Sequence, residues 1–340
     1  MKLMKFSQRL KLIPPVCLAL TVFVAGQCGQ GHDGLGRDGR GGDGRGGDGR
    51  SREATELKVR SEMLVSTDWL AQHLHDPGLI VLCIASSAEF CEQGRIAGSR
   101  FVSLSAIAIT RDGVPNELPA LSDLQRIFES VGVSDQSRVV LYGERYGLFA
   151  ARAYYTLDYM GAAGHASLLN GGLEKWKAEN RALTAEPPKI QPGQLTVKAK
   201  PEILISLNDM QAIARTAPES AAIMDARPAD EFSGAKISED VPAAGHIPNA
   251  HGLYWMRLLE SPSNPVLRPE AELRELFREA GAGDNRKVVS YCRSGMQSSY
   301  DYFVARYLGY EAAMYDGSFY EWSRHSLPVV KEAKQQSPAR

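Results

Sequence analysis

Cysteine and histidine are scarce in this chain, and neither is arranged to hold a metal. The 340 residues contain 5 cysteines and 7 histidines. No Cys-x-x-Cys pair occurs, and His73 and His75, two positions apart, would point in different directions on a helix. We therefore predict no metal site and no cofactor.

Excess charge of one sign is also missing. The formal net charge is −1, from 39 basic and 40 acidic residues. A chain balanced in this way has no field that would attract nucleic acid or an acidic polymer, so small molecules are the expected partners. Its hydrophobic content of 44% is sufficient for two packed cores.

The N-terminal apolar run Leu12–Ala25 is too short, and too interrupted by proline, for a transmembrane helix. Because basic residues precede it, it is typical of a secretory signal peptide, which predicts an exported, periplasmic protein. Cys28 comes soon after and is a candidate for lipidation, which would anchor the chain to a membrane. Cleavage without lipidation is the alternative. The Gly, Arg and Asp repeats that follow predict a flexible tether.

One cysteine lies in a setting that favours reactivity. Cys292 follows the apolar pair Val288-Val289, and the loop after it comprises Arg293, Ser294, Gly295, Met296 and Gln297. Apolar residues at helical spacing come next, with Ser298 or Ser299 as the predicted N-cap and Gly309 as the predicted stop. Loop amides and a helix N-terminus together favour a thiolate, which is the nucleophilic form. A buried strand-end cysteine without chemistry is the alternative.

The chain contains an internal repeat, and the first copy lacks this cysteine. The matching pairs are Leu124–Gly132 with Leu273–Gly281, Val139–Tyr142 with Val288–Tyr291, and Asn170–Leu173 with Asp316–Phe319. At the aligned position the first copy has Gly143 where the second has Cys292. We therefore expect one half to carry the nucleophile and the other to be catalytically silent.

The chain resembles the tandem-domain rhodanese family of sulfurtransferases over roughly residues 62–184 and 201–328. In the second copy the matching pieces are Asp225–Arg227, Glu231-Phe232, Gly245–Ala250, the Cys292 loop and Asp316-Gly317. The resemblance implies an α/β fold of two tandem rhodanese-like domains, each a parallel sheet flanked by helices. It also implies that the active cysteine lies in a loop at the domain interface. Alternation of short apolar strands with helical patterns supports the same class.

This gives a domain organisation along the whole chain. We expect a signal peptide (1–27), a tether (28–60), a catalytically silent domain (62–184), a proline-marked linker (185–200), a catalytic domain (201–328) and a polar tail (329–340). Two fused copies bury the interface that a dimer would otherwise supply, which favours a monomer.

The resemblance implies sulfur transfer through a persulfide on Cys292. Its thiolate would attack the outer sulfur of thiosulfate and release sulfite, and cyanide or another thiophilic acceptor would then take the sulfur. The amides from Arg293 to Gln297 are expected to stabilise the thiolate and the persulfide. Arg293 could also hold the dianion, unless it is simply a solvent-exposed arginine.

Four residues are expected to support the loop rather than to touch substrate: Asp225, Arg227, Glu231 and His246. Asp225 and Arg227 would be satisfied by pairing with Glu231 or with the loop backbone, and His246 would stabilise a turn. Trp255 and Trp322 could wall the pocket, although core positions are favoured for both.

Three other functions compete with this interpretation. A 3-mercaptopyruvate sulfurtransferase uses the same fold, but such relatives typically have an arginine where this chain has Glu231, and an acid would repel the substrate carboxylate. A related phosphatase needs an arginine six residues after the cysteine, where this chain has Ser298. The third is a non-catalytic sulfur-binding or docking protein, against which the intact Cys292 loop argues.

Two further expectations concern Cys83, Cys91 and Asn249. Two separate buried thiols are favoured for the cysteines; a disulfide would require Cα atoms within about 7 Å. Asn249 stands where a glycine is usual in the family, and asparagine tolerates the left-handed backbone that a turn there needs.

Overall fold

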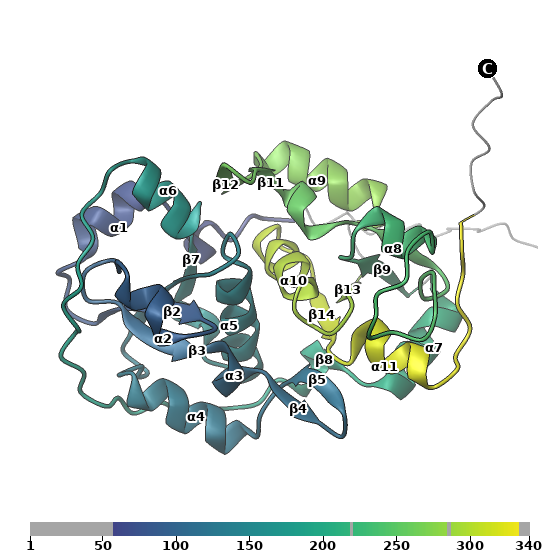
Figure 1. The fold of residues 1–340 in the computed structure, drawn as a ribbon, viewed down its shortest axis with the longest axis horizontal. Helices are drawn as coiled ribbons and strands as arrows, with labels where there is room; N and C mark the ends of the chain where they lie inside the picture. Colours follow the sequence, from purple (N-terminus) through teal and green to yellow (C-terminus); the bar gives the residue numbers. More distant parts are fainter. Residues whose placement is uncertain (1–56, 218–219, 284–286, 333–340) are drawn as a thin grey trace, which may run out of the picture. The chain divides into compact units, whose positions relative to one another are not determined.

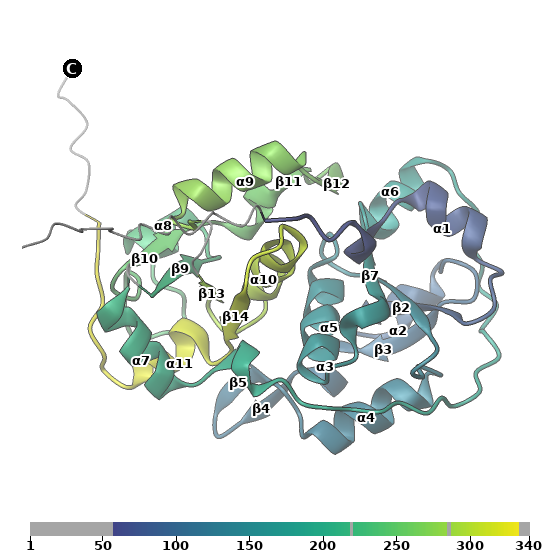
Figure 2. The ribbon, with the colours of Figure 1, turned by 180° about the vertical axis from the view of Figure 1, so that it is seen from behind.

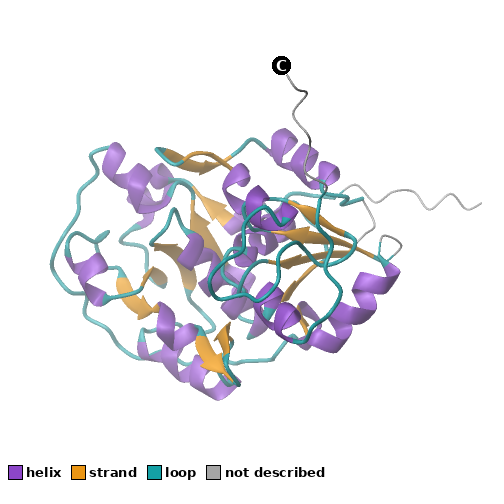
Figure 3. Cartoon of the chain, turned by 45° about the vertical axis from the view of Figure 1, so that its right-hand side comes forward, coloured by secondary structure: helices purple, strands orange, loops and turns teal. Residues whose placement is uncertain are grey.

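Two five-stranded parallel sheets, one from each half of the chain, form the framework (Figure 1). The computed structural model describes residues 57–217, 220–283 and 287–332, and these residues belong to one compact unit. Helices surround the strands of both sheets, as Figure 3 shows with the two element types in different colours. The α/β fold class expected from the sequence is therefore confirmed.

The first sheet has the strand order β1-β7-β6-β2-β3, with every neighbouring pair parallel. The strands are β1 (Leu64–Val65), β2 (Leu79–Ala85), β3 (Arg100–Ser103), β6 (Arg138–Gly143) and β7 (Ala166–Leu169). The helices of this half are α1 (Thr67–His73), α2 (Ala88–Glu92), α3 (Leu104–Ile107), α4 (Leu121–Ser130), α5 (Leu148–Tyr159) and α6 (Gly172–Ala178). A hairpin of β4 (Ile109–Arg111) and β5 (Val114–Glu117) extends from this half.

The second sheet has the order β10-β9-β13-β14-β8, again entirely parallel. Its strands are β8 (Leu204–Ile205), β9 (Ala221–Asp225), β10 (Ala250–Gly252), β13 (Lys287–Tyr291) and β14 (Ala312–Tyr315). The helices are α7 (Leu207–Thr216), α8 (Ala229–Ser233), α9 (Glu270–Glu279), α10 (Ser298–Tyr307) and α11 (Ser318–Arg324). The strands β11 (Leu259–Ser261) and β12 (Asn264–Leu267) form a second hairpin. Short 3₁₀ turns lie at Ser61–Met63, Ala163–His165, Pro201–Ile203 and Trp255–Leu258.

Strand register confirms the repeat seen in the sequence. In the first sheet Cys83 lies opposite Tyr142, and in the second Asp225 lies opposite Tyr291. Cys83 and Asp225 are therefore equivalent positions, one strand away from the residues that precede Gly143 and Cys292.

The two halves meet along α5 and α10, which lie side by side in both views of the ribbon (Figures 1 and 2). Tyr154 of α5 packs edge-on against Phe303 of α10, with ring centroids 4.9 Å apart. Tyr155 and Tyr302 form a second such pair at 5.1 Å. A continuous apolar core therefore crosses the domain boundary and fixes what lies at its edge.

The expectation of two separate thiols at Cys83 and Cys91 is wrong. The structure joins them in a disulfide, with 6.3 Å between the Cα atoms. The helix α2 folds back over the end of β2, so both cysteines are buried in one apolar cluster and lie within bonding range.

The predicted N-cap of the helix after the Cys292 loop is also wrong. Helix α10 includes both serines, and Gln297 is the N-cap residue, without a capping side chain. The two hydroxyls are engaged elsewhere: Ser298 donates to the Cys292 sulfur and Ser299 to the Met296 carbonyl. The predicted stop is confirmed, because Gly309 follows the last turn in a left-handed conformation, with φ at +95°. Asn249, at φ +62°, likewise adopts the left-handed backbone expected of it.

The outermost described residues at both ends make more contacts with the domains than the sequence suggests. The predicted tether runs to residue 60, but the Arg60 amide donates to the Tyr307 carbonyl, and Arg274 donates to the Leu57 carbonyl. Figure 2 shows this purple segment passing α10 on its way to the first sheet. The predicted tail begins at 329, yet Val330 and His246 exchange backbone hydrogen bonds. Leu57, Val59 and Val329 find apolar neighbours, which the sequence alone does not show.

The remaining terminal predictions lie outside the described residues. They are the signal peptide, lipidation of Cys28, most of the tether and the end of the tail. Within residues 57–217, 220–283 and 287–332, every helix is too short or too polar to traverse a bilayer.

Candidate active site

Cys292 comes directly after β13, at the carboxyl edge of the second sheet, and α10 begins at Ser298. The residue is 1% exposed, and among the described residues it is the cysteine that stays free. Ser298 donates a hydrogen bond from Oγ to its Sγ, over 3.6 Å. The predicted strand, loop and helix arrangement is therefore present around this sulfur.

Ser318, at the start of α11, forms hydrogen bonds with the backbone of the Cys292 loop. Its Oγ accepts hydrogen bonds from the amides of Cys292 (3.2 Å) and Gly295 (3.0 Å). The amides of Phe319 and Tyr320 donate to the carbonyls of Cys292 and Arg293. These bonds hold the first turn of the loop against α11 and fix the position of the sulfur.

The Gly295 amide is consequently not available to the sulfur, which corrects part of the expected set. Within the described residues, the amides of Arg293, Ser294, Met296 and Gln297 have no protein acceptor. These four belong to the stretch expected to stabilise the thiolate. Gly295 has a different use, because its φ is +77° and a Cβ there would lie 2.3 Å from Asp316 Oδ1.

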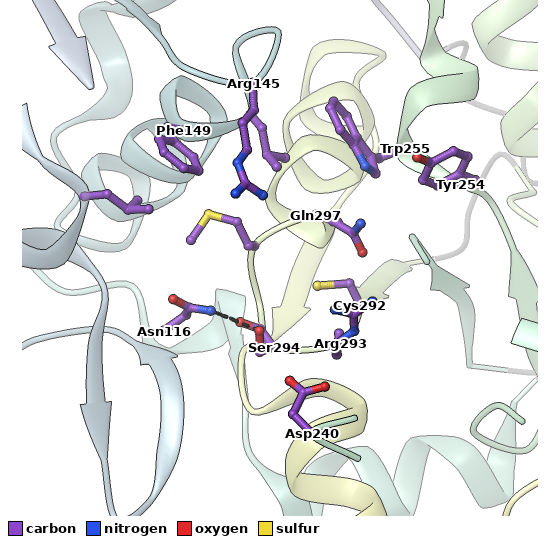
Figure 4. A pocket seen from close by; sticks show the side chains of 13 residues that line it. Asn116, Arg145, Phe149, Asp240, Tyr254, Trp255, Cys292, Arg293, Ser294 and Gln297 are labelled. Atoms are coloured by element: carbon purple, nitrogen blue, oxygen red, sulfur yellow. Dashed lines mark hydrogen bonds between the residues drawn. The ribbon is translucent and has the colours of Figure 1, made fainter. Parts of the chain in front are cut away.

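The first half of the chain holds the other side of the loop. Asn116 donates from Nδ2 to the carbonyl (3.0 Å) and the hydroxyl (2.9 Å) of Ser294, as the dashed line in Figure 4 indicates. Arg152 of α5 donates to the Gly295 carbonyl at 3.1 Å. It also forms a bidentate, fully buried pair with Asp316. With these carbonyls bound, the loop amides that have no acceptor in the described residues remain available as hydrogen-bond donors.

Arg293 is paired with Glu231 rather than free. Its guanidinium donates to both carboxylate oxygens of Glu231, whose side chain is almost completely buried. Burial alone would lower the pKa of Arg293, but its hydrogen bond to Glu231 and the nearby negative charges raise it. The cation expected to hold a substrate dianion is thus largely neutralised.

Asp225, Arg227 and His246 are buried. Arg227 forms a bidentate pair with Asp225 and donates to the Gly245 carbonyl at 2.9 Å. His246 makes a hydrogen bond of 2.9 Å to the Phe232 carbonyl and stacks on the Phe232 ring. Of the two expected pairings, with Glu231 or with the loop backbone, the one with Glu231 is not formed, because Glu231 is paired with Arg293. Arg227 is paired with Asp225 and with a backbone carbonyl instead.

A cavity of about 440 Å³ opens beside Cys292 and is lined by both halves of the chain. The first half supplies Leu104, Asn116, Arg145, Leu148 and Phe149, and the second supplies Asp240, Tyr254, Trp255 and the loop (Figure 4). Trp255 therefore walls the pocket. Trp322 lies in the core, where its Nε1 donates to the Pro328 carbonyl.

The family follows from sequence comparison with known proteins. A family model for the rhodanese-like domain matches the chain twice, at residues 66–179 and 207–325. The chain belongs to the rhodanese-like family. The tandem organisation expected from the repeat is confirmed by the two matches, which lie inside the predicted ranges 62–184 and 201–328.

Two named relatives align with this chain over nearly their full length. The sulfur carrier protein TtuD of Thermus thermophilus is 32% identical over 286 residues, which is 79% of this chain and 97% of the relative. A thiosulfate sulfurtransferase of Pseudomonas aeruginosa is 31% identical over 264 residues, covering 77% and 94%.

Two solved structures share the fold of this chain. The 3-mercaptopyruvate sulfotransferase SseA of Escherichia coli matches with a TM-score of 0.66 at 24% identity, covering 75% of this chain and 98% of its own. The Tum1 protein of Saccharomyces cerevisiae matches with a TM-score of 0.69 at 20% identity, covering 79% and 97%.

The first rhodanese-like domain cannot accept a cysteine at the equivalent position. Gly143 ends β6 directly beside β2, and a Cβ built on it would lie 2.2 Å from the Ile84 carbonyl oxygen. Its neighbour Glu144 turns away and accepts hydrogen bonds from Ser86. The difference between the two domains is therefore set by the backbone as well as by the residue type.

Sequence reasoning missed the contributions of the first domain to the site, namely Asn116, Arg145, Phe149 and Arg152. Only Arg152 carried a local signal, because it is a charged residue with apolar neighbours on both sides in α5. The structure shows it to be fully buried. Nothing in the sequence near Asn116 or Arg145 indicates a site.

Proposed function

We propose that this rhodanese-like protein is a sulfurtransferase that moves a sulfane sulfur from thiosulfate to a thiophilic acceptor through a Cys292 persulfide. The observation that carries the proposal is the setting of Cys292. It is a free thiol at a loop with unpaired amides, and it borders a cavity shared by the two domains. The family match and the relative named thiosulfate sulfurtransferase support the same chemistry.

The reaction proceeds by two displacements. The Cys292 thiolate attacks the outer sulfur of thiosulfate, a new S–S bond forms, and the old S–S bond breaks as sulfite leaves with its electron pair. The loop amides and the Ser298 hydroxyl stabilise the negative charge on the persulfide. An acceptor such as cyanide then attacks the terminal sulfur, leaves as thiocyanate and restores the thiolate.

Intact-protein mass spectrometry tests the proposal directly. The protein, incubated with thiosulfate, should gain the mass of one sulfur atom, and cyanide should remove it. Cys292→Ser is the matched control and should gain nothing. The absence of a sulfur gain in the wild-type protein would exclude thiosulfate as the donor.

3-Mercaptopyruvate remains the alternative donor, and the structure weakens the sequence argument against it. Glu231 was expected to repel the substrate carboxylate, but its charge is compensated by Arg293. Separate incubations with each donor decide between them, because only a donor that the protein uses adds a sulfur atom to Cys292.

A carrier role is the second candidate, favoured by the relative named sulfur carrier protein. A carrier would form the persulfide but pass the sulfur to a protein partner rather than to cyanide. Steady-state kinetics distinguishes the two roles. A sulfurtransferase shows ping-pong turnover with cyanide, whereas a carrier loads once and turns over slowly.

We also propose that the protein is exported. The apolar run at residues 12–25 supports this, and so does the Cys83–Cys91 disulfide, because disulfides persist in oxidising compartments. A lipid on Cys28 would hold the domains at a membrane. Cell fractionation tests both ideas: Cys28→Ala should release the protein from membranes, and wild-type protein found only in the soluble fraction would exclude the anchor.

A further inference from the structure

The first domain contributes an arginine to the cavity. This arginine comes from the loop that is equivalent, in the repeat, to the Cys292 loop of the second domain. Arg145 lies two residues after Gly143, the position equivalent to Cys292. Its side chain points into the cavity from the side opposite Asp240, as Figure 4 shows.

The guanidinium of Arg145 is uncommitted within the part of the chain that the structure describes. It has no hydrogen bond or ion pair with a carboxylate or carbonyl there, and its Cζ lies over the face of the Phe149 ring, 5.6 Å from the ring centroid. The adjacent Glu144 is already bound to Ser86 through its carboxylate. The other arginine at the cavity, Arg293, is paired with Glu231. Arg145 is thus the lining cation with unused hydrogen-bond donors.

The backbone that presents Arg145 is unusual. Arg145 and Tyr146 both have left-handed conformations, with φ of +57° and +59°, and Gly147 continues at +83°. Such conformations are unfavourable for residues with a side chain and persist where surrounding contacts hold them. The Tyr146 amide donates to Glu174, and the Leu148 amide to the Arg145 carbonyl. This strained turn aims the side chain at the cavity.

We propose that Arg145 of the first domain binds the anionic end of the sulfur donor while Cys292 of the second domain attacks its sulfur. The inference rests on the proposed function for the identity of the donor. That donor is a small anion whose charged group is bonded directly to the sulfur under attack. A guanidinium supplies the planar pair of donors that suits sulfonate or carboxylate oxygens. The first domain is then a substrate-binding half.

Alkylation of Cys292 tests this without requiring sulfur transfer. Iodoacetate and iodoacetamide both react with the thiolate, forming a C–S bond and releasing iodide, but only iodoacetate carries a charge. The ratio of the two rate constants therefore reports anion binding, because any change in thiolate reactivity cancels. Arg145→Ala should lower the ratio about tenfold, the factor expected for the loss of a charged hydrogen bond. Arg145→Lys should lower it less.

The matched control is Arg126→Ala, which removes the same charge from an exposed site on α4. Its ratio should equal that of the wild-type protein. An unchanged ratio in Arg145→Ala, with an unchanged unfolding midpoint, would overturn the inference.

Persulfide formation separates this inference from the proposed function. If wild-type protein gains no sulfur from thiosulfate while the alkylation ratio still depends on Arg145, thiosulfate fails as the donor and the anion site stands. If Arg145→Ala loads sulfur from subsaturating thiosulfate as fast as wild type, the function stands and the role of Arg145 fails.

Discussion

At the scale of single residues, the charge of the Cys292 loop is controlled by Glu231. This carboxylate is 3% exposed at its side chain and is satisfied by Arg293, whose side chain is 37% exposed at the edge of the cavity. The pair leaves little net positive charge for an anionic donor. Such a contact fixes the geometry of Arg293 at the expense of its attraction for substrate.

Glu231→Gln should therefore strengthen the binding of an anionic donor. The amide keeps the shape and one acceptor but releases the full charge of Arg293. We expect the KM for thiosulfate to fall about fivefold, corresponding to about 1 kcal/mol for a partly exposed charge. Steady-state kinetics at low ionic strength measures the change.

The double variant Glu231→Gln/Arg293→Ala is the control. It should lose the gain, because the released cation is gone and no buried carboxylate is left unpaired. Arg293→Ala alone is less informative, since it strands Glu231 and destabilises the fold. A KM that rises in Glu231→Gln would show that Arg293 needs its partner to reach the donor.

The sequence identifies a site residue only where the residues next to it in the chain form a recognisable pattern. Cys292 is marked by the strand before it, the glycine after it and the helix that follows, all within a short segment. Arg145 and Asn116 reach the cavity only because two domains pack together, and neither has such a pattern. The pairing of Glu231 with Arg293 is equally non-local, spanning 62 residues.

At the scale of elements, the hairpin β4-β5 acts on the loop of the opposite domain. Asn116 of β5 has a left-handed backbone, with φ at +63°, and donates two hydrogen bonds to Ser294. Arg152 of α5 donates to the adjacent carbonyl. The first domain thus orients the peptide groups that the proposed mechanism uses to stabilise a thiolate.

Asn116→Gly should impair catalysis with little loss of stability. Glycine keeps the left-handed backbone while removing the amide donor. We expect kcat to fall about tenfold, from the loss of about 1.4 kcal/mol of loop ordering. Alkylation of Cys292 at a fixed pH should also slow, because the loop amides would be less well ordered around the sulfur.

Asn116→Asp is the matched variant, because it keeps the size of the side chain but cannot donate to the Ser294 carbonyl. It should resemble the glycine variant in kcat. Full activity in both would show that Arg152 and Ser318 hold the loop without help from the hairpin.

The sequence predicts an element well where one periodic pattern determines its position. It predicts poorly the features that depend on tertiary contacts. Helix α10 follows the spacing of its apolar residues, but its first turn depends on serine hydroxyls that bind Cys292 and Met296 instead of capping. The disulfide depends on α2 folding back over β2, which spacing does not reveal.

At the scale of the whole molecule, the contact between the domains contains a titrating carboxyl. Burial, together with the nearby Asp316 carboxylate, raises the pKa of Glu117 from 4.5 to about 7, although Arg152 opposes the change. Between these two values the unfolded chain has released the proton that the folded protein still holds. The free energy of unfolding should therefore fall as the pH rises through this window.

Glu117→Gln should remove this part of the pH dependence. The variant should gain stability relative to wild type at pH 7.5 and show a smaller difference at pH 4.5, where Glu117 is protonated in the folded protein. Denaturant unfolding at the two pH values measures both differences. Equal differences at the two values would show that Glu117 titrates normally.

The tandem fold was the most predictable feature, because two copies of one pattern support each other. Matches at Val139–Tyr142 and Val288–Tyr291 fix equivalent strands, and the register of both sheets agrees with them. The packing of α5 on α10 had no such internal check. Everything that depends on it, from Arg152 to the cavity, had to come from the structure.

The close approach of Gly143 to Ile84 has a consequence for redesign. Replacing this glycine with cysteine would force β2 and β6 apart before the new sulfur met any substrate. A second reaction centre could be grafted only by exchanging the whole crossover between strand and helix, including the turn at Arg145. Each loop therefore fits only the strands of its own domain. A version of this protein with the domain order reversed would have to keep each loop together with those strands.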